Sequence, residues 1–163
     1  MRSSPQNVND MSLSWPFIFI LALFLQVVGA PQPAGELLDP EEKAKIEKEK
    51  NVEGRIKVYE AASKRMLKTL ETAVDQEDFQ SVPENLKLWT SLLLKSLEDI
   101  ESNLKTKKKS RALIKYEIEV RKAIANTESY KIRAPVEQQE VFDSCLAQAE
   151  KVRKRLVEIL FQP

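Results

Sequence analysis

The sequence predicts an all-α protein, built as an antiparallel four-helix bundle that follows an N-terminal hydrophobic signal segment. Prolines stand where helices are expected to begin, apolar residues recur every three or four positions between them, and only 3 of 163 residues are glycine. No segment alternates apolar and polar residues for long enough to predict a strand. The 26 basic and 25 acidic side chains give a dense, balanced charge, which is typical of helices with solvated outer faces.

Residues 1–30 have the pattern of a secretory signal peptide. The apolar run 15–28 would form a helix about 21 Å long, shorter than the ~30 Å hydrocarbon core of a bilayer, and the small residues Gly29 and Ala30 follow it. The alternative is a retained signal anchor over residues 15–30, because the segment before the run is weakly basic and Pro31 follows the expected cleavage point. We therefore expect a secreted or periplasmic protein, which contacts the membrane only if this segment is retained.

A Pro- and Gly-containing linker is expected over residues 31–39, followed by a helical domain over residues 40–163. The domain starts at DPEE, residues 39–42, which offers an N-cap, a proline in the first turn and a capping-box glutamate. Residues 40–52 carry many charges and few apolar side chains, so they are expected to form an exposed helical arm. Gly54 is expected to mark a kink or frayed boundary before the buried part of this helix.

Four apolar stripes predict the helix faces that form the core. The motifs SVPE at residues 81–84 and APVE at residues 134–137 predict starts for the second and last helices. Leu88, Leu92 and Leu94 are expected to widen the second stripe, and Ile114 and Ile118 to widen the third. The stripes are Val52, Ile56, Tyr59, Ser63, Met66, Leu70 and Ala73; Leu86, Trp89, Leu93, Leu97, Ile100 and Leu104; Leu113, Tyr116, Val120, Ala123, Thr127 and Tyr130; and Phe142, Cys145, Ala149, Val152, Leu156 and Ile159.

The junction between the second and third helices, KTKKKSR at residues 105–111, contains neither Gly nor Pro. One continuous helix over residues 83–131 is therefore the alternative, giving a three-helix arrangement around a central rod of roughly 70 Å. A break near Ser110 is favoured, because four segments of similar length can cover one another and the rod would be left half uncovered.

The same junction holds the densest run of one charge. Its basic side chains could contact anionic lipid headgroups or acidic polysaccharide, although a solvated loop between helices is the simpler interpretation. Nucleic acid is not expected as a partner, because the net charge is only +1 and no aromatic residues interleave the run. The candidate contact residues are Lys105, Lys107, Lys108, Lys109 and Arg111.

Composition argues against an enzyme. The chain has no histidine and one cysteine, Cys145, so metal centres and nucleophilic triads lack required residues. Neighbouring acids such as Glu117 and Glu119 have basic residues three or four positions away and are interpreted as ion pairs on exposed faces. We predict no catalytic, cofactor-binding or metal-binding residues and no cofactor, and Cys145 is expected to be buried.

The function predicted from these features is that of an exported, non-catalytic helical bundle acting as a structural, scaffolding or protein-binding module. Its partner is an unknown protein or a second copy of the chain. The alternative is a carrier that opens to hold a lipid or other apolar molecule among Leu92, Leu93, Tyr116 and Phe142. An enzyme that uses carboxylates alone is the least favoured hypothesis, since it needs several acids converging in one cleft.

Overall fold

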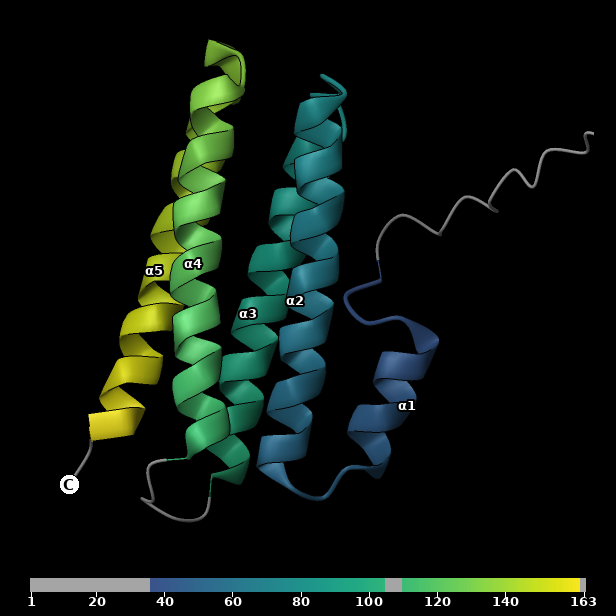
Figure 1. Cartoon of the computed structure of the whole chain (residues 1–163), viewed down its shortest axis with the longest axis vertical. Helices are drawn as coiled ribbons and strands as arrows, with labels where there is room; N and C mark the ends of the chain where they lie inside the picture. The colour runs from purple at the N-terminus through teal and green to yellow at the C-terminus, as the bar shows by residue number, and fades with distance from the viewer. Residues whose placement is uncertain (1–35, 105–109, 162–163) are drawn as a thin grey trace, which may run out of the picture. The chain divides into compact units, whose positions relative to one another are not determined.

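The computed structural model describes residues 36–104 and 110–161, and within them it contains helices and no strand (Figure 1). The all-α class is confirmed. The signal segment over residues 1–30 and most of the linker lie outside the described residues. No helix among the described residues has the length and apolar character needed to cross a bilayer.

The described part of the chain forms a helical bundle. Helix α2 packs against α3 and α4, and α5 packs against the same two helices, so the four long helices share one core. Figure 1 shows them side by side, with short turns joining α2 to α3 and α4 to α5. The elements are α1 (Pro40–Lys48), α2 (Val52–Asp75), α3 (Val82–Asn103), α4 (Arg111–Arg133), the 3₁₀ helix η1 (Val136–Gln138) and α5 (Gln139–Phe161).

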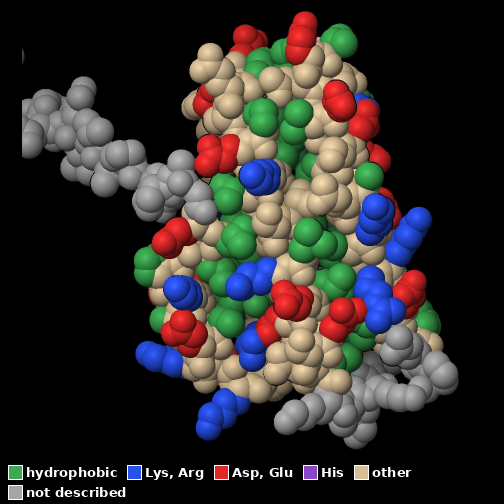
Figure 2. All heavy atoms as spheres, turned by 180° about the vertical axis from the view of Figure 1, so that it is seen from behind, with side chains coloured by type: hydrophobic (Ala, Val, Ile, Leu, Met, Phe, Trp, Pro, Cys, Tyr) green, Lys and Arg blue, Asp and Glu red, His purple; other side chains and the backbone are tan. Residues whose placement is uncertain are grey.

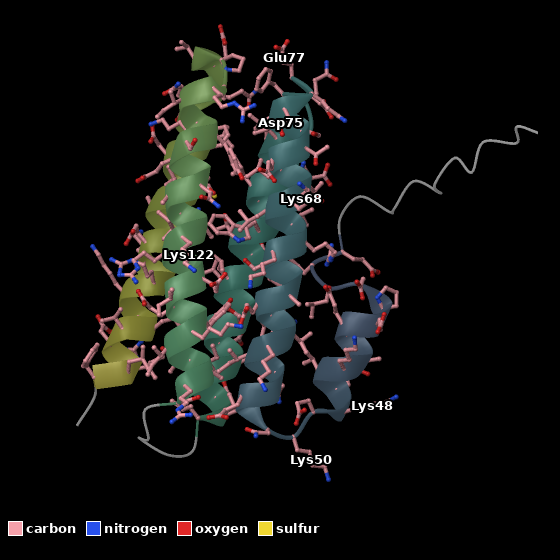
Figure 3. All side chains as sticks on the ribbon, viewed as in Figure 1. Lys48, Lys50, Lys68, Asp75, Glu77 and Lys122 are labelled. Carbon is pink, nitrogen blue, oxygen red and sulfur yellow. The ribbon has the colours of Figure 1, made fainter. Side chains whose placement is uncertain are left out.

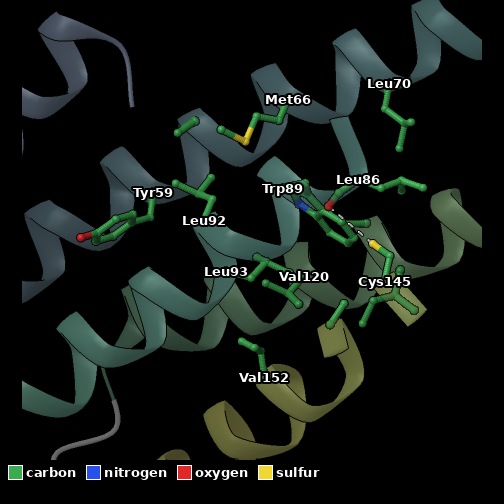
Figure 4. Close-up of a cluster of buried hydrophobic side chains, with 14 of the residues drawn as sticks. Tyr59, Met66, Leu70, Leu86, Trp89, Leu92, Leu93, Val120, Cys145 and Val152 are labelled. Atoms are coloured by element: carbon green, nitrogen blue, oxygen red, sulfur yellow. Dashed lines mark hydrogen bonds between the residues drawn. The ribbon is translucent and has the colours of Figure 1, made fainter. Parts of the chain in front are cut away.

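The core follows the predicted stripes closely. Trp89 of α3 is fully buried among the core side chains (Figure 4). Its indole Nε1 donates a 2.9 Å hydrogen bond to Ser63 Oγ of α2. Two predicted side chains are instead exposed: Leu94 on α3 is 48% exposed and Ile114 on α4 is 39% exposed. Both belong to helices that are apolar over a broad face, and neighbouring helices cover only part of that face.

The charged arm is a separate helix, which corrects the prediction that it continues into α2. Helix α1 ends at Lys48 and α2 begins at Val52, and α1 packs back onto α2. Its predicted capping box is confirmed: Asp39 Oδ1 accepts from the Glu42 amide at 2.7 Å, and Glu42 Oε2 accepts from the Asp39 amide at 2.9 Å.

The position of the break before α2 also differs from the prediction. Gly54 lies in the first turn of α2, after the break. A Cβ at Gly54 would clash with the side chain of Glu49, whose Oε1 accepts a 2.9 Å hydrogen bond from the amide of Asn51. The glycine therefore leaves room for the turn that reverses the chain, and does not itself end a helix.

The alternative of one helix over residues 83–131 is wrong. Helix α3 ends at Asn103, where the ψ angle of Leu104 is 86°, and α4 begins at Arg111. Ser110 caps α4, with its Oγ 3.4 Å from the amide of Leu113, and it also donates to Glu53 Oε1 at 2.7 Å. This contact with α2 ties the start of α4 to the bundle.

Two predicted helix starts differ in detail. Ser81 precedes α3 as expected, but its hydroxyl donates to the Asp78 carbonyl at 3.1 Å and makes no capping hydrogen bond to α3. The last helix does not begin directly after Pro135: η1 comes first, and α5 starts at Gln139. In both cases the proline lies close to the start of the helix. The first residue of the helix depends on the conformation of the preceding turn.

Candidate functional site

The predicted basic contact site is described at one residue only. Lys105, Lys107, Lys108 and Lys109 lie outside the described residues, and Arg111 is exposed as the first residue of α4. Of the described residues on either side of it, Leu104 is partly buried and Ser110 is buried. Contact of this run with an anionic surface stays a prediction.

Neighbouring acids of α3 and α4 form ion pairs between helices, and Glu117 is buried, which corrects the expectation of pairs on exposed faces. Glu117 Oε1 lies 3.3 Å from Arg153 Nη1 of α5, and Glu119 lies 3.2 Å from Lys64 Nζ of α2. Asp99 of α3 pairs with Arg55 of α2. Among the described residues, no group of three or more acidic or cysteine side chains is placed to hold a metal ion.

The polar cluster around Asp99 is closed rather than open to a ligand. Tyr59 packs beside the Arg55 and Asp99 pair, and burial together with the Asp99 charge raises the pKa of Tyr59 to about 12. Asn103 Nδ2 donates to Asp99 Oδ1 at 3.0 Å. The pair and the neutral Tyr59 phenol join α2 to α3, although Arg55 Nε and Asp99 Oδ2 are buried without a hydrogen-bond partner among the described residues. The raised pKa keeps the phenol from ionising at ordinary pH.

Cys145 is buried in the core, as predicted. Its Sγ lies 3.1 Å from Oγ1 of Thr90, so this contact joins α5 to α3. Burial raises the pKa of the Cys145 thiol, and the Thr90 hydrogen bond offsets only part of this rise. The thiol is therefore protonated and shielded, which is the state of an unreactive cysteine.

The residues of the predicted carrier site form packed core. Leu92, Leu93, Tyr116 and Phe142 are all fully buried, and the Tyr116 hydroxyl lies 2.7 Å from Ser96 Oγ. Burial raises the pKa of Tyr116, so this hydroxyl stays neutral within the core. An apolar ligand among these four side chains would have to displace contacts that the helices already make.

The surface carries shallow depressions between helices. One, of about 260 Å³, lies between α2 and α4 and is bridged at its rim by Lys64, whose Nζ is 2.7 Å from Glu60 and 3.2 Å from Glu119. Two others, of about 500 Å³ each, flank the ridge that Pro83 and Lys87 form on α3. The apolar side chains that line these depressions are themselves buried or half-buried. The depressions therefore offer little apolar surface to a ligand.

The strongest exposed apolar feature lies at the turn between α4 and α5. Ile132 is 82% exposed and Val136 is 80% exposed, although Ala134 between them is buried. An exposed ion pair connects this turn to α2, with Arg133 Nη2 2.6 Å from Asp75 Oδ1. Two aliphatic side chains are thus held in water on an ordered part of the bundle.

The same end of the bundle is strongly acidic. Residues 69–88 and 127–143 carry nine acidic side chains against three basic ones, a net charge of −6 in a chain whose total is +1. We call these two ranges the acidic end. The acids are Glu71, Asp75, Glu77, Asp78, Glu84, Glu128, Glu137, Glu140 and Asp143, and the bases are Lys87, Lys131 and Arg133.

The few bases of the acidic end do not neutralise most of its acids. Lys131 pairs with Asp143 and Arg133 with Asp75, and none of the ion pairs among the described residues involves Glu77, Asp78 or Glu137. Figure 2 shows acidic side chains at the upper end of the bundle and most of the visible basic ones in its lower half. In Figure 3, Asp75 and Glu77 lie near the upper end, whereas Lys48 and Lys50 lie near the lower end. The bundle is therefore electrically polarised along its length.

Glu77 occupies the conformation that a helix end normally gives to glycine. Its φ angle is 56°, and the turn after α2 closes with hydrogen bonds from the Asp78 amide to Ala73 O at 2.8 Å and from the Glu77 amide to Val74 O at 3.2 Å. This is the pattern of a Schellman motif, in which a residue with a Cβ is strained. A carboxylate thus occupies the tip at a cost in stability.

The acidic end does not appear among the features predicted from sequence patterns. One indication was present: no Lys or Arg occurs between Lys68 and Lys87, while five acids do. The second half of the feature depends on the fold, which brings the turn at residues 134–138 to the same end.

Comparison with known proteins adds no homologue: no family model, no curated protein and no solved structure matches this chain. The function of this chain is therefore inferred from its own surface.

Proposed function

We propose that this chain is an exported, non-catalytic antiparallel four-helix bundle, preceded by the short helix α1, that acts as a protein-binding module. Residues 1–30 act as its signal peptide, or residues 15–30 as its membrane anchor. Its partner binds at the acidic end, around Ile132 and Val136.

The observation that carries this proposal is the exposure of Ile132 and Val136 at 82% and 80%. Complete burial of an aliphatic side chain of this size contributes about 1.5 to 3 kcal/mol, so a partner that covered both would gain a sizeable driving force. The pair flanks the buried Ala134, whose amide donates to Tyr130 O and Lys131 O at 3.1 Å, so the turn is already ordered and little ordering entropy would oppose binding.

Site-specific photo-crosslinking in the cells that naturally make the protein tests the binding role. A photoreactive phenylalanine analogue is placed at Ile132 in one variant, at Val136 in a second, and at Leu94 in a control. Leu94 is also an exposed aliphatic residue, but it lies in the middle of α3. We expect one discrete protein adduct from positions 132 and 136 and none from position 94.

An adduct from Leu94 alone, or no adduct from positions 132 and 136, would contradict the binding role assigned to the acidic end. N-terminal sequencing of protein recovered outside the cytoplasm tests export separately. A new N-terminus near residue 30 supports a cleaved signal, and an intact N-terminus in the membrane fraction supports the anchor. Recovery of the intact chain only from the soluble cytoplasm would contradict export.

A further inference from the structure

The chemistry of the partner can be inferred from the charge that surrounds the exposed apolar pair. We infer, on the basis of the function proposed above, that the acidic end binds a basic amphipathic protein segment. Apolar side chains of this segment cover Ile132 and Val136, and its lysines or arginines pair with the surrounding carboxylates.

The apolar part of this surface sets the size of the contact. Ile132 is the penultimate residue of α4 and Val136 the first residue of η1, so the two flank the Ala134–Pro135 turn at the tip of the hairpin. Ala134, between them in the sequence, is buried. A partner needs only a few apolar side chains on one face to cover this pair, as one face of an amphipathic helix provides.

The carboxylates set the charge of the partner. Glu137 directly follows Val136, and Glu77 and Asp78 lie on the neighbouring turn, which the Asp75 and Arg133 ion pair connects to the α4 end. All three are exposed, and none has a basic partner among the described residues. A partner with lysine or arginine around its apolar face would supply the missing opposite charge, whereas an acidic partner would be repelled.

Local helix chemistry explains some acids of this end, and Glu137 in the first turn of η1 is one of them, but it does not explain Glu77. Glu84 and Glu140 lie in the first turns of α3 and α5, where a carboxylate stabilises the unpaired amides of a helix start. Glu77 instead follows the end of α2, where a negative charge is unfavourable, and it has a positive φ angle. The helix ends therefore give no reason for a carboxylate at Glu77.

The charge also argues against a second copy binding with the same end. Two acidic ends brought together would place a net charge of −6 against another of −6. Such an arrangement would be disfavoured at ordinary ionic strength, where exposed charges interact over about 8 to 10 Å. A separate basic partner is therefore favoured over a symmetric dimer through this surface.

A binding titration with the full chain tests the inference. The probe is a fluorescently labelled helical peptide with leucine on one face and lysine on the other, and a second peptide replaces every lysine by glutamate. We expect the lysine peptide to bind and the glutamate peptide not to bind. The triple variant Glu77→Gln, Asp78→Asn, Glu137→Gln should weaken binding about tenfold, since it removes three exposed carboxylates that would pair with lysines of the peptide.

A matched control removes the same number of charges elsewhere. Glu36, Glu47 and Glu98 are exposed and have no ion pair among the described residues, so their change to glutamine should alter binding less than about twofold. The double variant Ile132→Ser, Val136→Ser should weaken binding about tenfold or more while Leu94→Ser leaves it unchanged. Circular dichroism and unfolding curves establish that each variant folds.

Three outcomes would overturn the inference: equal binding of both peptides, equal weakening by the triple variant and its control, or binding that is insensitive to the Ile132 and Val136 changes. If the chain self-associates and this self-association competes with peptide binding, the surface binds a second copy of the chain and the inference is wrong. These failures differ from failure of the binding role itself. A photo-crosslinked partner whose contact segment is neutral or acidic would leave that role standing and contradict only the basic chemistry.

Discussion

Arg65 of α2 and Glu42 of α1 form a two-pronged ion pair, with Arg65 Nη2 2.7 Å from Glu42 Oε2 and Arg65 Nε 3.1 Å from Glu42 Oε1. Glu42 is also the capping-box residue of α1, so a local helix cap and a contact between helices share one carboxylate. Similar pairs cross the other helix interfaces. They are Arg55 with Asp99 (α2 and α3), Lys64 with Glu119 (α2 and α4), Arg153 with Glu117 (α4 and α5) and Arg155 with Glu101 (α3 and α5).

The first prediction concerns the attachment of α1. Changing Arg65 to Met keeps most of the alkyl stem but removes the guanidinium, which leaves the partly buried Glu42 without its cation. Hydrogen exchange of amides in residues 40–48 should accelerate about fivefold to tenfold, corresponding to about 1 to 1.4 kcal/mol. The matched control Lys57→Met removes an exposed cation of α2 that has no ion pair among the described residues. Equal acceleration in both variants would contradict the role of the ion pair.

The second prediction concerns the buried hydrogen bond between Trp89 and Ser63. Ser63→Ala leaves the indole N–H without an acceptor in the core, so the free energy of unfolding should fall by about 1 to 3 kcal/mol. Ser91→Ala on the outer side of α3 should change it by less than about 0.5 kcal/mol. Urea unfolding curves measure both values, and an unchanged midpoint for Ser63→Ala would contradict a hydrogen bond that matters to stability.

The third prediction concerns the strain at Glu77. Glycine adopts a φ angle of 56° without a Cβ clash, so Glu77→Gly should raise the free energy of unfolding by about 0.5 to 1 kcal/mol. The neighbouring change Gln76→Gly should lower stability, because Gln76 has a φ angle of −91° and glycine there only adds freedom to the unfolded chain. Thermal unfolding of the two variants is expected to shift in opposite directions, and a shared direction would refute the strain.

The fourth prediction concerns acid pH. Burial would raise the pKa of Glu60, but hydrogen bonds from Lys64 and Lys115 lower it below its ordinary value of 4.5. Glu60 therefore stabilises the folded state above about pH 4.5, and this contribution is lost as the pH falls through the lower folded pKa. The chain has no histidine, so carboxylates dominate titration in this range.

Urea unfolding of wild type and Glu60→Gln at about pH 7 and about pH 3.5 measures this effect. The wild type should lose more stability between the two pH values than the variant does. Glu98→Gln, at an exposed acid without an ion pair among the described residues, serves as control and should behave as wild type. An equal acid loss in wild type and Glu60→Gln would contradict the pKa shift.

Much of the fold could be predicted because local and global preferences agree in this chain. Ile56, Trp89, Tyr116 and Leu156 recur with helical spacing and are all buried, and the capping box at Asp39 forms as its residues predict. Periodicity identifies a helix face without knowledge of its neighbours. The core was therefore largely predictable.

The features that the sequence did not predict depend on contacts between residues far apart in the chain. The break before Val52 is stabilised by α1 packing back onto α2, and part of that contact is the Glu42 and Arg65 pair, whose members are 23 positions apart. Leu94 is exposed because none of the described helices covers its side of α3, and the spacing of apolar residues cannot show this. The acidic end likewise requires two turns, at residues 76–81 and 134–138, to meet in space.

The central claim is that this bundle binds another protein through the acidic end. Hydrogen exchange of the full chain, alone and with the partner identified by photo-crosslinking, tests this claim most directly. We predict protection concentrated at residues 76–81 and 132–140. Protection confined to the middle of α3, or to the depression between α2 and α4, with both turns unchanged, would contradict the claim.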